Sequence, residues 1–113
     1  MTAVAALIAK LEAATEADER TIIQSALDHA VNHRWISERD YHRASGWLES
    51  GASLDAALTL VPAGWAWWAD KTDRGAIWAI SPALGVVEGL QGHHPTSPAL
   101  ALCIAASRAR MGK

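Results

Sequence analysis

Four polar residues, His93, His94, Thr96 and Ser97, stand just before a segment that has the signals of a helix start. The free N–H groups and the dipole at a helix N-terminus favour an anion such as a phosphate, and nearby hydroxyl groups add donors. Every helix start offers the same groups, so a polar loop that caps the helix is the simpler interpretation. These residues nevertheless form the candidate phosphate site of this sequence.

The chain has six tryptophans and no phenylalanine. Four of the tryptophans fall close together, at Trp65, Trp67, Trp68 and Trp78. Their rings are natural bulk for a protein core, which is the interpretation we favour. Two alternatives stay open: the rings stack on a planar ligand, a contact worth about 1 to 3 kcal/mol per base, or they close a homodimer.

Metal binding is the chemistry that His29, His33 and His42 suggest, because two histidines four positions apart can meet one ion. The usual companions are missing from the sequence: it has no HExxH glutamate and no CxxC pair. Solvated surface histidines are the more common case. We therefore expect no metal and no other cofactor.

Catalytic signatures are also missing from the sequence, which has no P-loop and no dinucleotide fingerprint. The acids Asp70 and Asp73 share a segment with two basic residues, a composition typical of a solvated turn. The single cysteine, Cys103, lies in an apolar run and is expected to behave as a small buried hydrophobe. The sequence therefore predicts a protein that is not an enzyme.

Size, charge and hydropathy indicate a single soluble domain. With 113 residues, half of them hydrophobic, the chain is expected to form one domain over residues 1–113. The net charge of -2 gives no reason to expect a nucleic-acid partner. No apolar run is long enough to span a membrane, and a lone cysteine suits a reducing compartment. We expect a soluble protein located in the cytoplasm.

Helical signals fill the first half of the chain. Apolar residues recur at helical spacing from Val4 to Leu11 and again towards Asn32. A third helix is expected between a cap at Ser37 and a left-handed closing residue at Gly51. The sequence therefore predicts a helical hairpin at residues 16–50, followed by a short helical turn after position 53.

Extended structure is expected after Pro62. Apolar segments on both sides of "DKTDRG" predict a β-hairpin at residues 65–80 with a six-residue connection, and "GVVEGL" predicts a third strand at residues 85–90. A final, deeply buried helix is expected from residue 98 to about residue 110. The predicted fold class is α+β, with a short antiparallel sheet packed between helices.

Three segments, "SLDAALTLVPAGWAW", "WAIS" and "SPALALCIAASRAR", resemble the phage ABA sandwich family over residues 53–110. Members of that family are small phage and prophage proteins in which a sheet lies between helices. No activity is established for the family as a whole. The resemblance therefore implies a setting and a fold, and it assigns no catalytic residue.

These observations favour a small, non-enzymatic phage or prophage accessory protein that binds a host or phage macromolecule, with a protein partner and a homo-oligomeric state expected. Trp35 and Trp47, in or beside the helical hairpin, are the candidate anchors for that partner. The alternative is a protein that sequesters a nucleotide-like molecule, stacking its base on the hairpin tryptophans and holding its phosphate near Ser97.

Overall fold

The computed structural model describes residues 3–62, 65–72, 75–82 and 90–111, and the side chains from position 66 to position 91 lie outside the described part. The helices are α1 (Ala3–Ala13), the 3-10 turn η1 (Glu16–Asp18), α2 (Glu19–Asn32), α3 (Glu38–Glu49), α4 (Ser53–Leu58) and α5 (Pro98–Met111). The strands are β1 (Trp65–Thr72), β2 (Gly75–Pro82) and β3 (Leu90–His94).

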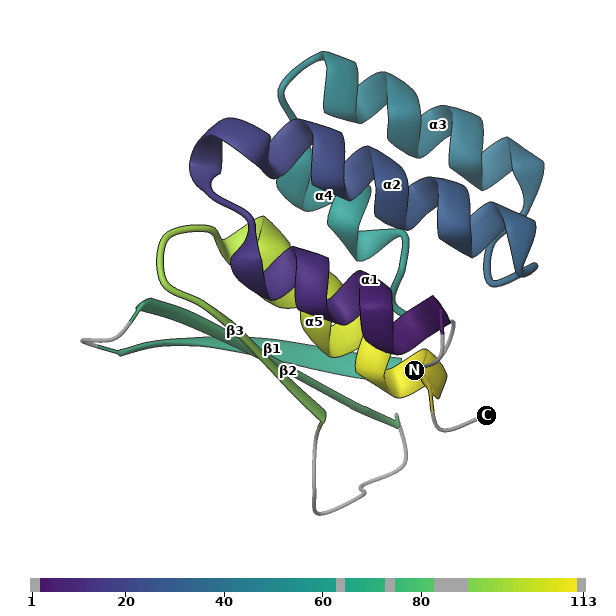
Figure 1. Cartoon of the computed structure of the whole chain (residues 1–113). Helices are drawn as coiled ribbons and strands as arrows, with labels where there is room; N and C mark the ends of the chain where they lie inside the picture. The colour runs from purple at the N-terminus through teal and green to yellow at the C-terminus, as the bar shows by residue number, and fades with distance from the viewer. Residues whose placement is uncertain (1–2, 63–64, 73–74, 83–89, 112–113) are drawn as a thin grey trace.

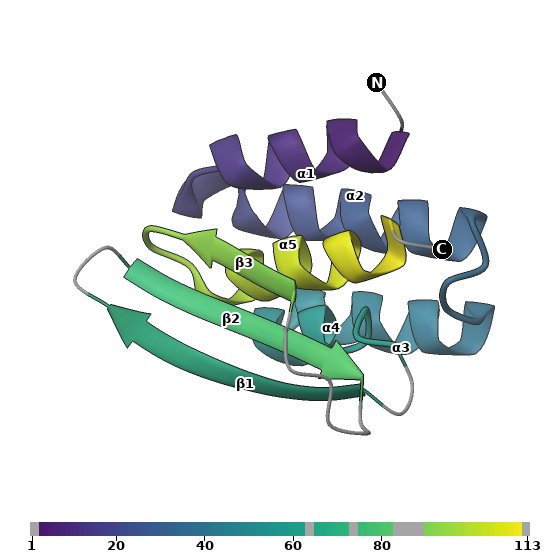
Figure 2. The ribbon, with the colours of Figure 1, turned by 90° about the horizontal axis from the view of Figure 1, so that it is seen from below.

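The described helices all lie on one side of the sheet (Figure 1). Figure 2 shows the molecule from below, with the sheet in front of the helices. No described helix covers the face of the sheet that is turned to the viewer there. The predicted α+β fold with a sheet packed between helices is therefore wrong: the described chain is mostly helical, and the sheet is an outer layer. The physical reason is that α5 is apolar enough to be buried all round, so α1, α4 and part of α2 pack against it on the side away from the sheet, and α3 packs on α2 and α4.

The sheet has the order β1-β2-β3 with antiparallel pairing throughout. Thr72 pairs with Gly75, so the hairpin strands run further than expected and the predicted six-residue connection is too long. The third strand begins at Leu90, where the sequence-based prediction ended it, and the rest of the predicted range, residues 85–89, lies outside the described residues.

Gly92 explains why β3 forms where a loop was expected. A Cβ atom at this position would lie 2.0 Å from the carbonyl oxygen of Ala101 and 2.4 Å from the backbone nitrogen of Ala105, both in α5. Only glycine permits this approach of a strand to a helix backbone. Packing against α5 therefore decides the position of β3.

Helix α5 forms the centre of the core between the sheet and the other helices. From Leu100 to Ala106 every residue is fully buried, which confirms the predicted deep burial of the final helix. Burial raises the pKa of the Cys103 thiol to about 12. This cysteine is therefore an unreactive core residue.

Helices α2 and α3 lie side by side and are joined by a polar cluster. The hydroxyl of Tyr41 donates to Oδ1 of Asp28 at 2.5 Å, and the amide of Gln24 donates to both Asp28 and Tyr41. At the start of α3, Ser37 accepts a hydrogen bond from the backbone N–H of Asp40, which confirms the predicted cap. These contacts fix the start of α3, which forms one wall of the groove described next.

Candidate binding groove around Trp35

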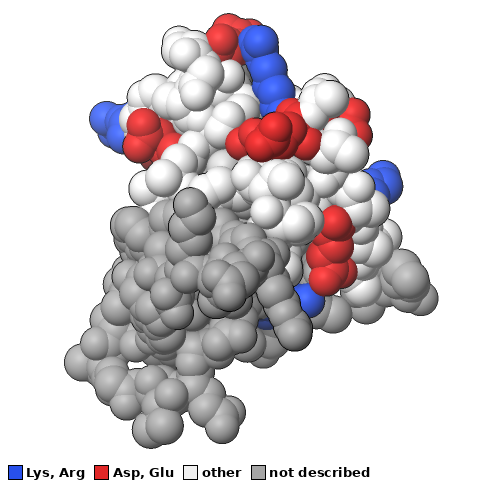
Figure 3. All heavy atoms as spheres, turned by 90° about the vertical axis from the view of Figure 1, so that its left-hand side faces the viewer, with Lys and Arg blue, Asp and Glu red and all other residues white. Residues whose placement is uncertain are grey.

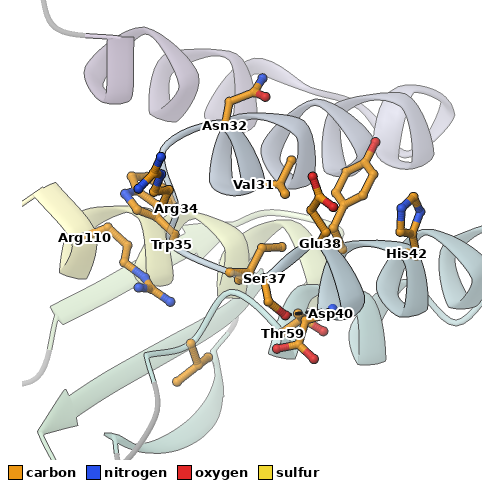
Figure 4. Close-up of a pocket in the computed structure, with 13 residues that line it drawn as sticks. Val31, Asn32, Arg34, Trp35, Ser37, Glu38, Asp40, His42, Thr59 and Arg110 are labelled. Atoms are coloured by element: carbon orange, nitrogen blue, oxygen red, sulfur yellow. Dashed lines mark hydrogen bonds between the residues drawn. The ribbon is translucent and has the colours of Figure 1, made fainter.

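An open hollow of about 800 Å³ lies where the end of α2, the start of α3 and the end of α5 meet (Figure 4). We call it the Trp35 groove, because Trp35 is its largest aromatic lining residue. Its wall also includes the segment after α4, through Thr59 and Val61. The volume is in the range of ligand-binding clefts.

Helix α2 ends in a Schellman motif that places Trp35 in the groove. The N–H of Trp35 donates to the carbonyl of Ala30 at 2.8 Å, and the N–H of Arg34 donates to the carbonyl of Val31 at 3.2 Å. Arg34 has a φ of 59°, in the left-handed region that the motif requires. Glycine is the usual residue there, so arginine holds this position at a conformational cost of about 1 to 2 kcal/mol.

Trp35 is held between groups from two helices. The ring of His29 meets it edge-on, with centroids 4.9 Å apart, and the guanidinium carbon of Arg110 lies 5.7 Å from the centre of the Trp35 ring. The side chain is half-buried and packs against the core. Trp35 is therefore a rigid aromatic surface with part of its ring open to the groove.

Arg110 is held in place by the backbone as well. Its Nε and Nη2 atoms donate to the carbonyl oxygen of Leu60 at 3.3 and 3.2 Å. Burial lowers the pKa of its guanidinium, which reflects the cost of taking this charge from water. Among the described residues, no carboxylate lies within ion-pair distance of Arg110. The ion pair that these residues do form joins a different arginine, Arg108, to Glu12.

The groove has ends of opposite charge (Figure 4). Arg34 and Arg110 lie beside Trp35, whereas Glu38 and Asp40 lie along the first turn of α3. An occupant that carries both an acidic and a basic group would match this arrangement.

At the predicted phosphate site, the polar groups of the buried residues are bonded within the chain. His94 is buried, with Nε2 at 2.6 Å from the carbonyl oxygen of Ala14 and with Nδ1 accepting the N–H groups of Thr96 and Ser97. Ser97 is also buried, and its hydroxyl accepts the N–H of Leu100. A phosphate here would have to replace bonds that the chain already makes. His93 and Thr96 are exposed, and binding at this segment stays a prediction.

The four clustered tryptophans, interpreted as core residues with a stacking surface or a dimer contact as alternatives, lie largely outside the described residues. The side chains of Trp67, Trp68 and Trp78 are not described, whereas Trp65 is half-buried and packs against the core. Of the predicted anchors, Trp35 lines the groove and Trp47 is 39% exposed on α3 without lining it. The two anchors therefore belong to separate surfaces.

The histidines considered as metal ligands lie in two places. The rings of His29 and His33 stack at 4.0 Å, and His42 lies beside Tyr41 on α3. Among the described residues, no group of three or more metal-ligating side chains comes together.

Sequence reasoning missed Arg34 and Arg110 as groove residues. The contact of Arg110 with Leu60 joins residues 50 apart in sequence, which no local pattern reveals. Arg34 gave no signal in the sequence, because only its φ of 59° in the structure shows that it closes α2 in the left-handed region.

Comparison of the chain with protein-family models, with curated proteins and with solved structures gave no match. A search of the described helices found none with the length and apolar character needed to cross a membrane.

Proposed function

We propose that this chain is a small, non-enzymatic binding protein that holds a segment of a partner protein in the Trp35 groove. The observation that carries the proposal is a half-buried tryptophan, fixed by His29 and Arg110, inside an open concave surface. Binding energy at protein interfaces is concentrated in Trp, Tyr and Arg side chains that sit in such pockets. The groove supplies all three types, because Tyr41 and Arg34 also line it.

The charge distribution favours a protein over a nucleic acid as partner. Basic residues (Arg34 and Arg110) and acidic residues (Glu38 and Asp40) both line the groove, and the two kinds of charge are also interspersed over the helices on the face shown in Figure 3, at the other end of the molecule. A nucleic-acid surface would instead gather basic residues in one patch. We retain the setting that the resemblance implies, a phage or prophage accessory protein in the host cytoplasm.

Site-specific photo-crosslinking in the host cell tests the proposal. A benzophenone amino acid replaces Asn32, which is exposed and lines the groove, and the matched control replaces Arg20, which is exposed on α2 outside the groove. The expected result is a crosslinked protein from position 32 that is absent from position 20.

Two substitutions of Trp35 show whether the crosslink depends on its ring. Trp35→Ala should abolish it, whereas Trp35→Phe, which keeps an aromatic ring, should retain part of it. Far-ultraviolet circular dichroism checks that both variants fold. Equal crosslinking from positions 20 and 32, or an unchanged crosslink in folded Trp35→Ala, would rule out the groove as the partner site.

A further inference from the structure

We propose that the basic end of the Trp35 groove binds a carboxylate of the partner segment, an Asp or Glu side chain followed by an apolar residue that lies on the Trp35 ring. A basic residue of the same segment then lies against Glu38 and Asp40. This inference rests on the proposed function and adds the chemistry of the occupant.

Arg110 supplies the first argument. A guanidinium has five N–H donors, and the described contacts of Arg110 use its Nε and Nη2 atoms on a single carbonyl oxygen. Its charge is half-buried and has no acidic partner among the described residues. A carboxylate from outside the chain compensates this charge and pairs with a guanidinium whose position is already set, so little side-chain entropy is lost.

Arg34 supplies an independent argument. The Schellman motif at the end of α2 has an equivalent at the end of α3, where Gly51 has a φ of 89° and the N–H of Ala52 donates to Trp47. The chain therefore uses glycine in one motif and arginine in the other. A residue kept in a costly backbone conformation points to a function for its side chain, and this side chain lines the groove.

The acidic end decides between classes of occupant. Glu38 and Asp40 repel a polyanion, so a nucleotide that stacks on Trp35 would place its phosphates in a groove that is only partly basic. A peptide with one acidic and one basic residue matches both ends. We therefore assign the groove to a mixed-charge peptide segment.

Selection from a phage-displayed library of random linear peptides, with the whole chain as bait, tests this assignment. We expect the enriched peptides to share an Asp or Glu beside an apolar residue and a Lys or Arg further along. Fluorescence anisotropy of a labelled, enriched peptide then measures the affinity for each variant.

Arg110→Gln should weaken binding by about tenfold to a hundredfold, the effect of losing a hydrogen bond between charged groups. Arg34→Gly should weaken it less, because Arg34 is exposed. The matched control is Arg43→Gln, which removes an exposed charge outside the groove and should leave affinity unchanged.

The possible failures are distinguishable. Peptides that need Trp35 but lack an acidic residue, or that bind Arg110→Gln as well as the parent chain, would overturn the carboxylate inference and leave the proposed function standing. Displacement of the peptide by AMP at equal or lower concentration would overturn the peptide assignment in favour of a nucleotide. A selection without any Trp35-dependent peptide would count against both proposals.

Discussion

Arg34 and Gly51 occupy the same position in two copies of one helix-closing motif, with φ values of 59° and 89°. In each copy, the residue that follows donates its N–H to a carbonyl five positions back: Trp35 to Ala30, and Ala52 to Trp47, both at 2.8 Å. The two positions are therefore a matched pair within one protein, and they separate the cost of the backbone from the use of the side chain.

Arg34→Gly should stabilise the folded chain by about 0.5 to 1 kcal/mol, because relief of the left-handed strain exceeds the added entropy of the unfolded chain. Gly51→Ala should have the opposite sign and a similar size. The free energy of unfolding from urea titration measures both. A loss of stability in Arg34→Gly would mean that the arginine side chain supports the fold, and it would remove the functional argument from its backbone conformation.

Gly92→Ala should destabilise the protein by about 3 kcal/mol or more, because the new methyl group meets the backbone of α5, which cannot move aside without displacing the core. The matched control is Gly46→Ala in α3, where a Cβ atom meets nothing within 4 Å. That substitution should stabilise the chain by about 0.5 to 1 kcal/mol through helix propensity. Thermal unfolding of the two variants side by side gives the comparison. Equal transitions would mean that β3 does not lie against α5 as described.

Tyr41 should titrate above its usual pKa of 10.0, because its hydrogen bond to Asp28, and then burial, raise the pKa of the phenol. The chain has one tyrosine, so ultraviolet absorbance of tyrosinate reports this group alone. Asp28→Ala should move the pKa back towards the usual value, whereas Asp55→Ala on the exposed face of α4 should not change it. A wild-type titration at the usual pKa would contradict the contact between α2 and α3.

Stability should fall as the pH drops below 6.5, because burial, and then the charge of His33, lower the pKa of His29 from that value. Below pH 6.5 the unfolded chain binds a proton at His29 that the folded chain does not bind. The stability that neutral His29 contributes to the folded state is therefore present above pH 6.5 and is lost as the pH falls below it. Urea midpoints across this range measure the effect. His29→Gln should reduce the pH dependence of stability. An identical pH profile for His29→Gln would exclude this explanation.

Local signals in the sequence were sufficient for the helices, because apolar spacing and the caps at Ser37 and Gly51 act within a few residues. They were not sufficient for the layering. Strand alternation does not say which face of a sheet a helix covers, and the position of β3 depends on Gly92 fitting against α5, a contact between elements.

The groove was predictable in part. Trp35, a candidate anchor in the sequence because a large aromatic residue beside a helix end is noticeable on its own, lines the groove. Arg110 was missed as a groove residue because its role depends on Leu60 and Trp35, which only the folded chain brings near. In the sequence His94 looked free to bind a ligand. Its hydrogen-bond partner, the carbonyl oxygen of Ala14, is 80 positions away and is brought near only by folding.

The order of elements also has a consequence for biosynthesis. The helix around which the others pack, α5, is the last element of the described chain, so a ribosome releases it after every element that needs it. Until then the surfaces of α1, α2 and α4 that contact α5 have nothing to pack against, although α2, α3 and α4 can already contact one another. The core around α5 therefore cannot close before α5 itself has been synthesised.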